Sequence, residues 1–438
     1  MVRAPGVRDK DWKYTQDQKG ISMTAYPLDL IRGRFPALDD QHTAFLDNPA
    51  GTLVPGSVID AVADAMRQAS SNLGGCFDAS VRADAIWRAA HEAAADFLNA
   101  ASWQEIIIGP NMTTLAFQMS RVIGKTLKAG DEIIVTRMDH EGNVSPWLTM
   151  AEDHGLVVKW LPFNTESWQI EPADLASLLT PRTRFLALNY ASNMTGSIND
   201  VATLAGMARA AGALVWVDAV QLAPHRLPDV KALGCDFLAC SSYKFFGPHL
   251  GILWGGADVL RALPPHRVRC QSDDLPDRFS TGTPQTELLA GLTATIDYLA
   301  WVGQATGHDG TRREQLAGAY RAFDAYEAGM TRRLIGGLTD LPGVRLIGIA
   351  NPNLFNHRVP TVSFTHDRIS THRFARVLAD AQINVWSGHN YALEPARHLG
   401  LSENEGVVRI GIAHYNTEDE IRRTLEVIGE LITGAAQT

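Results

Sequence analysis

The chain has 438 residues, 45% of them hydrophobic and 20% charged, so it is long enough for one large globular domain and a smaller one. Its formal net charge of -9 at pH 7 argues against nucleic acid or an anionic membrane surface as the main partner. The sequence has no run of about 18 apolar residues, the pattern typical of a membrane-spanning helix.

The sequence favours a cytoplasmic location. Residues 1–22 are polar and lack the apolar core of a signal peptide, and we expect residues 1–27 to form a loosely ordered extension. The four cysteines have no CxxC spacing, which argues against a zinc site and against a disulfide framework. Free thiols of this kind are typical of a reducing compartment.

The first part of the chain after this extension predicts a short strand, a turn and a helix. Residues 45–51 (Phe-Leu-Asp-Asn-Pro-Ala-Gly) are typical of a short strand that ends in a turn. Pro55 suits the first turn of a helix, and Ile59, Val62 and Met66 follow it at helical spacing. This spacing places the three apolar side chains on one face of the predicted helix.

Residues 105–114 contain a candidate anion site. Their sequence, Glu-Ile-Ile-Ile-Gly-Pro-Asn-Met-Thr-Thr, predicts a strand, a tight turn and the start of a helix. The first backbone N–H groups of a helix have no intrahelical partner, and the helix dipole favours negative charge there. A helix start that is simply capped by a threonine is the alternative interpretation.

Strand-like and helical segments alternate through the middle of the chain. Such an alternation predicts a mainly parallel sheet that is covered by helices on both faces, with a site at the carboxyl ends of the strands. The apolar runs that indicate the strands are residues 133–136, 156–160, 185–189, 215–217 and 237–240.

Two of these strands end on polar residues. Asp218 and Gln221 follow one strand, and Ser241 and Lys244 follow the next. The chain has only 8 lysines and none after Lys244, because arginine supplies the positive charge elsewhere. A lysine amine that is shielded from water can lose its proton and attack a carbonyl, which arginine cannot do at neutral pH.

An acid at one strand end and a lysine after the next is the pairing that pyridoxal 5'-phosphate (PLP) requires. The lysine amine holds the aldehyde of the cofactor. A carboxylate beside the pyridine nitrogen keeps that nitrogen protonated, so that the ring draws electrons from the substrate. On this spacing alone, a surface lysine that happens to follow a core strand remains an alternative.

From about residue 320 the pattern changes to a smaller α+β unit. Strands are expected at residues 344–347, 361–364 and 407–410, followed by a helix that begins at a Thr417–Glu420 capping box and aligns Ile421, Leu425, Ile428 and Ile432. We therefore expect three parts. They are the extension of residues 1–27, a large domain of residues 28–310 whose N-terminal segment packs on the smaller domain, and a small C-terminal domain of residues 320–438.

Several segments resemble, in the same order, the fold-type I, class V aminotransferase family, and particularly its cysteine desulfurases. Residues 138–147 are similar to the desulfurase segment Glu-His-His-Ala-Asn-Ile-Val-Pro-Trp, and residues 191–196 to a Ser-Asn-x-x-Gly turn. Residues 278–284 resemble a Gly-Thr-Pro segment. Arg409 with residues 415–417 resembles an arginine followed by Tyr-Asn-Thr. The resemblance runs from about residue 28 to the end of the chain.

The resemblance implies a fold, a cofactor and an assembly. The fold is that of fold-type I PLP-dependent transferases, an α/β fold with a mainly parallel seven-stranded sheet and a small α+β C-terminal domain. The cofactor is PLP, the substrate is a small amino acid, and the assembly is a homodimer with shared active sites. In such a dimer Thr283 is expected to reach the cofactor phosphate of the partner subunit.

The resemblance also implies the catalytic residues. Lys244 is expected to bind the cofactor aldehyde, and Asp218 to pair with the ring nitrogen. His140 is expected to stack on the ring, where an imidazole can exchange protons with the substrate. The planar fork of Arg409 suits bidentate capture of an α-carboxylate, and a salt bridge to a structural acid is the alternative.

Further contacts follow from the same resemblance. The expected partners of the cofactor phosphate are Asn111, Met112, Thr113, Ser241 and Tyr243. Asn193 and Gln221 are expected at the phenolic oxygen, and Asn193 also at the substrate carboxylate. Purely structural roles for a lone histidine and for an asparagine in a turn are the alternatives.

One loop departs from the desulfurase pattern. Where similar desulfurases carry Arg-Thr-Gly-His-His-Cys-Ala, residues 386–392 read Trp-Ser-Gly-His-Asn-Tyr-Ala, so that Tyr391 stands at the position of the cysteine that attacks the substrate sulfur. A phenol cannot accept a persulfide sulfur. We therefore expect Tyr391 to contact the substrate without relaying sulfur.

The remaining groups predict a lyase that acts on a small L-amino acid by β-elimination or β-decarboxylation. Residues 224–226 and 243–251 also resemble a divergent class V branch that includes a fungal enzyme which removes the β-carboxyl group of aspartate. An aminotransferase or epimerase of the class V type is an alternative, and a PLP-binding protein without catalytic turnover is another.

Overall fold

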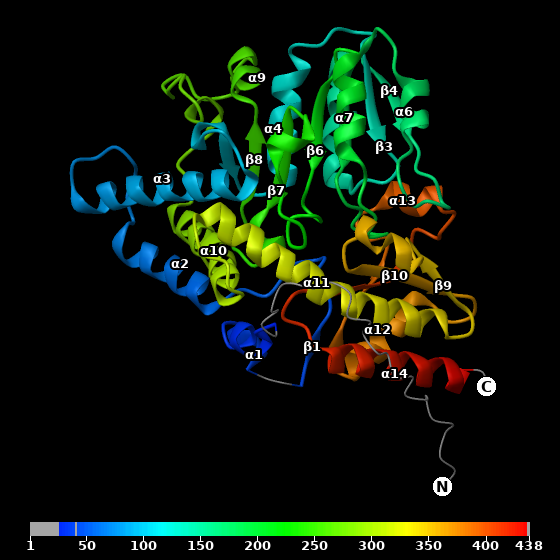
Figure 1. Cartoon of the computed structure of the whole chain (residues 1–438). Helices are drawn as coiled ribbons and strands as arrows, with labels where there is room; N and C mark the ends of the chain where they lie inside the picture. Colours follow the sequence, from blue (N-terminus) through cyan, green and yellow to red (C-terminus); the bar gives the residue numbers. More distant parts are fainter. Residues whose placement is uncertain (1–25, 40–41, 436–438) are drawn as a thin grey trace.

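A computed structural model describes residues 26–39 and 42–435. Figure 1 shows a large layered part that contains the wide sheet and, beside it, a smaller part built around a second sheet. Apart from its last two residues, the predicted extension of residues 1–27 lies outside the described residues.

The wide sheet has seven strands in the order β2-β8-β7-β6-β5-β3-β4. Its strands are β2 (Ile106–Gly109), β3 (Glu132–Thr136), β4 (Val157–Leu161), β5 (Thr183–Asn189), β6 (Leu214–Asp218), β7 (Phe237–Ser241) and β8 (Gly251–Gly255). Five neighbouring strands, β7, β6, β5, β3 and β4, run parallel to one another. β8 is antiparallel to both of its neighbours, β2 and β7. The predicted α/β fold with a mainly parallel seven-stranded sheet is confirmed, and β8 is a strand that the sequence did not indicate.

Helices cover both faces of this sheet. Alternate residues of a strand point to opposite faces, so Phe185 and Ala187 of β5 belong to one apolar layer and Leu186 and Leu188 to the other. This explains why the strands are continuous apolar runs. One face packs on α4 (Met112–Gly124), α5 (Ser145–His154) and α9 (Ala257–Ala262). The other packs on α3 (Asp78–Leu98), α6 (Pro172–Leu178), α7 (Val201–Ala210), α8 (Val230–Leu233) and α10 (Thr286–Ala305).

The helix predicted after Pro55 is α2 (Gly56–Gln68), which packs against α10. Its buried residues are Val58 and Ala65, whereas Ile59 is 50% and Met66 62% exposed in the single chain. The apolar face that the spacing indicated is therefore mostly not the face that packs on α10. Pro55 is the residue before the helix rather than part of its first turn.

The smaller sheet is antiparallel and has the strand order β12-β13-β10-β9. Its strands are β9 (Val344–Ile347), β10 (Thr361–His366), β12 (Trp386–Gly388) and β13 (Val407–Gly411). α12 (Thr371–Asp380) and α14 (Glu418–Ala435) pack on it, and short α13 (Leu393–His398) follows β12. The three predicted strands are confirmed, and so is the predicted capping box, because the backbone N–H of Glu420 donates to Thr417 Oγ1 and that of Thr417 to Glu420 Oε2.

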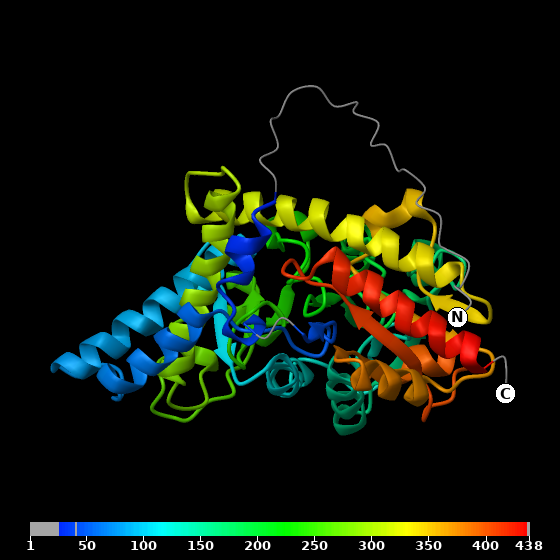
Figure 2. The ribbon, with the colours of Figure 1, turned by 90° about the horizontal axis from the view of Figure 1, so that it is seen from below.

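Two elements connect the larger and smaller parts. α11 (Arg312–Thr339) packs on α10 and also on α14, and Figure 2 shows it beside α14 along one side of the molecule. The second element is strand β1 (Ala44–Phe45), which follows α1 (Leu28–Arg32) in the chain. It pairs in parallel with β11 (Ile383–Asn384). The division into domains at residues 310–320 remains a prediction, and the β1–β11 pairing supports the expected packing of the N-terminal segment on the smaller part.

Candidate active site

The carboxyl ends of β6 and β7 bring Asp218 and Lys244 to the same edge of the sheet. Asp218 is the last residue of β6, and Lys244 lies in a single turn of 3-10 helix directly after β7. Parallel neighbouring strands end at the same edge, so these two groups meet although 26 positions separate their numbers. The structure thus places both residues at the position expected for a ligand site in an α/β fold.

The amine of Lys244 is largely shielded from water. Its Nζ donates a hydrogen bond to the backbone oxygen of Pro49. Burial, and next the positive charge of Arg409, lowers the pKa of this amine to about 7, while Asp47 and Asp218 oppose the shift. A substantial part of the amine is therefore uncharged at neutral pH, which is the state that attacks a carbonyl.

Asp218 is 6% exposed and has few polar partners. Its Oδ1 accepts the backbone N–H of Val220 at 2.8 Å. Burial raises the pKa of the carboxyl group to about 6, and the Val220 hydrogen bond and Lys244 lower it only in part. A cationic partner at this carboxylate, such as a protonated ring nitrogen, would reverse that shift.

His140 is held as a neutral imidazole. Its Nδ1 accepts the backbone N–H of Gly142 at 2.9 Å, so the ring proton is on Nε2. Burial, together with the nearby Lys244 and Arg409, lowers the pKa of the imidazole to about 4. The ring stacks against Tyr391 with 5.6 Å between the ring centroids.

The start of α4 is where the sequence predicts an anion site. Asn111 caps this helix by accepting the N–H of Thr114 at 2.8 Å, so the cap is an asparagine and the alternative of a threonine cap is wrong. The N–H of Met112 donates to Ser241 Oγ at 3.1 Å. Among the described residues, the N–H and the hydroxyl group of Thr113 have no hydrogen-bond partner, so both remain open to an anion at the helix N-terminus.

A close approach of two backbone segments shapes this anion site. A Cβ atom at Gly251 would lie 2.3 Å from the carbonyl carbon of Asn111 and 2.7 Å from the nitrogen of Met112. Only a glycine therefore lets β8 run directly under the first turn of α4.

Arg409 lies on β13 and is 4% exposed. Its Nη1 donates to the backbone oxygen of Asn193 at 3.2 Å, and its Nη2 is 3.7 Å from Asp47 Oδ1. Burial lowers the pKa of the guanidinium group to about 10, and Asp47 opposes that shift. The salt bridge to a structural acid that the sequence left open is therefore present, but it is long and occupies one nitrogen.

Several buried polar atoms around Arg409 have no hydrogen-bond partner within the described chain. They are Nε of Arg409, Oδ1 of Asp47, Oδ1 of Asn193 and Oδ1 of Asn390. Unpaired buried polar groups are costly in a folded protein and are typically satisfied by a ligand or water. This group of atoms marks where the polar groups of a small molecule would bind.

Three other predicted cofactor contacts, Gln221, Tyr243 and Thr283, have different surroundings. Gln221 is buried after β6 but donates from Nε2 to Thr361 Oγ1 at 2.9 Å. The ring of Tyr243 stacks on His249 with 4.8 Å between the centroids. Thr283 is exposed, and no described interaction joins it to the other site residues within this chain. Its predicted contact therefore remains an expectation about the partner subunit.

The loop that departs from the desulfurase pattern lies at this site. Trp386 of β12 is paired with Arg409 of β13. Tyr391 is 69% exposed, and its backbone oxygen accepts the N–H of Glu141, which directly follows His140. Asn390 and Tyr391 both have positive φ angles, of 55° and 57°, which is uncommon for residues other than glycine. The loop is thus attached to the segment that carries His140.

Sequence reasoning missed Asp47 and Pro49 as site residues. Both lie in the turn after β1, which the resemblance placed near the substrate without indicating its contacts. Their contacts with Arg409 and Lys244 join positions that are hundreds of residues apart, and no local pattern signals such contacts.

The fold and the site together define a PLP-dependent enzyme of fold-type I. The unpaired N–H and hydroxyl group of Thr113 at the start of α4 suit a phosphate, the Lys244 amine suits an aldehyde, and the buried Asp218 carboxylate suits a protonated ring nitrogen. The chain belongs to the aminotransferase class-V family, whose sequence pattern matches residues 44–424. PLP is the cofactor of this family.

Curated relatives match almost the whole chain. A cysteine desulfurase from Pectobacterium atrosepticum is 32% identical over 91% of this chain and 96% of its own. An aminotransferase-like protein from Gibberella zeae is 31% identical over 92% of this chain and 97% of its own. The solved apo structure of a cysteine desulfurase from Thermococcus onnurineus NA1 aligns with a TM-score of 0.83 and 27% identity, covering 94% of this chain and all of that one.

The described residues also lack two general features, a membrane-spanning helix and a cluster of metal ligands. None of their helices is long and apolar enough to cross a membrane. Within the same residues, no group of three or more His, Cys, Asp or Glu side chains is arranged to hold a metal ion.

Proposed function

We propose that this protein is a PLP-dependent lyase that removes the β-substituent of a small L-amino acid without passing sulfur to an enzyme cysteine. The observation that carries this proposal is Tyr391, which stacks on His140 at the position where a sulfur-relaying enzyme needs a thiol. Release of sulfide and pyruvate, with the amino group leaving as ammonia, or of carbon dioxide and alanine, is the expected outcome.

Three of the four cysteines support this assignment, and the fourth, Cys270, is exposed. No cysteine occurs in the loop of residues 386–392. Cys235 and Cys240 are buried, and burial raises the pKa of both thiols, to about 12 for Cys235, so neither forms a reactive thiolate at neutral pH. Cys76 is exposed in the connection between α2 and α3. Figures 1 and 2 place this connection at the opposite end of the chain's structure from α12, the helix that precedes the loop of residues 386–392.

The predicted roles of the site residues follow from their environment. Arg409 offers its unpaired Nε and its loosely held Nη2 to the substrate's α-carboxylate, while its Nη1 donates to the backbone oxygen of Asn193. Bound PLP supplies the electron-withdrawing ring that makes bonds at the α-carbon easier to break. Lys244, with a pKa near neutrality, is the group that takes up and returns a proton at that carbon, and neutral His140 covers the ring face.

We also propose a homodimer in a cytoplasmic location. Leu30, Ile59, Met66, Phe77 and Val81 are large apolar side chains that the single chain leaves at least half exposed, and they all come from α1, α2 and the start of α3. Apolar side chains gathered on neighbouring elements are typical of a subunit interface. In such a dimer the exposed Thr283 would reach the phosphate group of the partner's cofactor.

The test is to incubate the protein, loaded with PLP, with L-cysteine and separately with L-aspartate. We expect one of the two product pairs and no increase in protein mass by one sulfur atom. Tyr391→Cys restores the thiol at the desulfurase position and Tyr391→Phe is its matched control. Both variants are expected to retain the product pair, and a persulfide trapped on the wild-type chain would disprove the proposal.

An aminotransferase or an epimerase gives different results in the same experiment. An aminotransferase turns over only when a keto-acid acceptor is added, and an epimerase introduces solvent deuterium at the α-carbon without releasing a β-substituent. A protein that only binds PLP forms no product with any amino acid.

A further inference from the structure

One turn lies between the Lys244 amine and the buried guanidinium group of Arg409. The backbone oxygen of Pro49 accepts the hydrogen bond from the Lys244 amine. The carboxylate of Asp47 faces Arg409, with 3.7 Å between Oδ1 and Nη2. A displacement of residues 47–49 therefore alters the surroundings of both groups at once.

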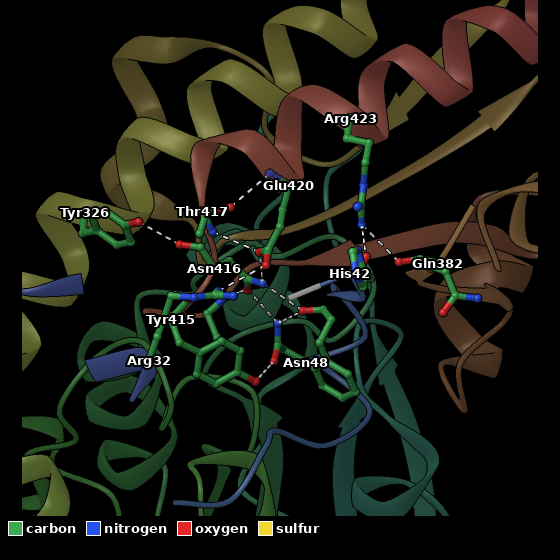
Figure 3. Close-up of polar contacts among 12 residues, drawn as sticks. Arg32, His42, Asn48, Tyr326, Gln382, Tyr415, Asn416, Thr417, Glu420 and Arg423 are labelled. Carbon is green, nitrogen blue, oxygen red and sulfur yellow. Dashed lines mark hydrogen bonds and ion pairs between the residues drawn. The ribbon is translucent and has the colours of Figure 1, made fainter. Parts of the chain in front are cut away.

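The side chain of the middle residue, Asn48, points into a buried polar network (Figure 3). Its Nδ2 lies 2.7 Å from the backbone oxygen of Gly411 and 3.1 Å from Asn416 Oδ1. Its Oδ1 accepts the hydroxyl group of Tyr415. Every polar atom of the Asn48 carboxamide is thus used to hold the turn in place.

The contact with Gly411 attaches the turn to the strand that carries Arg409. The N–H of Gly411 donates to the backbone oxygen of Leu46 at 2.8 Å. A Cβ atom at position 411 would lie 2.0 Å from Cδ of Pro49, so the proline ring packs directly on this glycine. Because Gly411 is two positions after Arg409 on β13, the turn and the arginine are held in one register.

The far side of the network belongs to the start of α14. Asn416 Nδ2 donates to Glu420 Oε2 at 2.8 Å, and Glu420 also forms the capping box of this helix. The hydroxyl group of Tyr326 donates to the backbone oxygen of Asn416 at 2.7 Å, on the side of Asn416 that faces away from Asn48 (Figure 3). The network therefore contains two tyrosine hydroxyl groups, of which only that of Tyr415 holds Asn48.

We propose that Asn48 and Tyr415 are positioning residues of the active site, which fix the turn of residues 47–49 between Lys244 and Arg409. Neither side chain donates to Lys244 or Arg409, so both act through the turn. The inference rests on the proposed role of Lys244 as the reactive amine.

The proposal predicts a change in the protonation of Lys244 when the network is weakened. The charged groups that act on this amine are Asp47, Asp218 and Arg409, and His140 is also close enough to sense it. Burial is the largest cause of the lowered pKa of Lys244. A turn that is no longer held admits water to the amine, and hydration favours the charged form, so the pKa rises.

The experiment compares Tyr415→Phe with Tyr326→Phe in the full chain freed of PLP. Both substitutions remove one hydroxyl group from the same network, but only the first removes a hydrogen bond to Asn48, and with it the acceptor of the Leu53 N–H. The rate at which acetic anhydride modifies Lys244 is followed against pH by peptide mass spectrometry, which reports the pKa of the amine without any substrate. We expect the wild type and Tyr326→Phe to titrate together, and Tyr415→Phe to titrate higher by about one unit, with about fivefold slower labelling at pH 7.

Thermal unfolding of both variants separates positioning from general destabilisation. If both variants lower the unfolding temperature to a similar extent and Lys244 titrates as in the wild type in both, the network is only structural and the proposal is wrong. Asn48→Ser, which keeps a small polar side chain, gives the same readout should Tyr415→Phe fail to fold. Failure of the proposed lyase activity is a separate result, because the titration of Lys244 needs no turnover.

Discussion

Asp218→Asn is expected to stabilise the chain without its cofactor while weakening the binding of PLP. The carboxyl group of Asp218 is buried, and its pKa of about 6 in the folded chain compares with an ordinary value of 3.8. A shift of this size corresponds to about 3 kcal/mol of differential stability between the two protonation states. The asparagine keeps an oxygen that can accept the Val220 N–H, so the substitution removes the charge without removing this hydrogen bond.

The difference in the free energy of unfolding between the two proteins depends on pH. Between pH 3.8 and about 6 the folded chain holds a proton on Asp218 that the unfolded chain has lost. The stability contributed by this group is therefore fully present below pH 3.8, is lost as the pH rises to about 6, and stays lost above. The asparagine variant does not titrate, so its advantage over the wild type should grow through that window and reach at most about 3 kcal/mol at pH 8.

The assay is chemical unfolding of both PLP-free proteins at pH 5 and pH 8, followed by the same measurement with PLP added. With PLP, the wild type should gain more stability than the variant, because only a carboxylate pairs with a protonated ring nitrogen. A variant that is less stable than the wild type at pH 8 without PLP, or that gains as much from PLP, would refute the reasoning.

Two further substitutions test other parts of the site. Arg409→Gln removes the proposed partner of the substrate carboxylate. Because about 3 kcal/mol of charge-assisted hydrogen bonding is lost, KM in steady-state kinetics should rise about 100-fold. The control Arg422→Gln, on the exposed face of α14, should change KM little. Equal KM values in the two variants would contradict that role. Gly251→Ala should lower PLP affinity in an equilibrium titration, because the new Cβ collides with the backbone at Asn111. Gly206→Ala, which meets no atom within 4 Å in α7, should leave the affinity unchanged, and a Gly251→Ala variant with wild-type affinity would show that the start of α4 is not the phosphate site.

The sequence predicted the parts of the fold that depend on local patterns. Strands β3, β5 and β6 are buried on both faces, so their residues form apolar runs that are readable without a partner strand. The capping box at Thr417 was also predictable from a local pattern, because its two residues are only three positions apart. β8 was missed because its five residues follow a turn, and its antiparallel direction is set by neighbours far away in the sequence.

The parts of the site that sequence reasoning missed depend on contacts between distant segments. Lys244 and Asp218 could be named because each follows an apolar strand, whereas nothing near Asp47 or Pro49 indicates that they contact the basic groups of the site. The face of α2 was misplaced for a related reason. The spacing of its apolar residues predicts an apolar face but does not tell what that face contacts. In the single chain Ile59 and Met66 of this face are exposed and do not pack on α10.

The central claim is that the amine of Lys244 carries PLP. The most direct measurement is to load the protein with PLP, reduce it with borohydride, digest it and locate the pyridoxyl group by peptide mass spectrometry. We predict that the group is found on Lys244 in the wild type and is absent from the peptide of a Lys244→Ala variant. Reduction that leaves the wild-type chain unmodified, or that attaches the group to another lysine, would contradict the account.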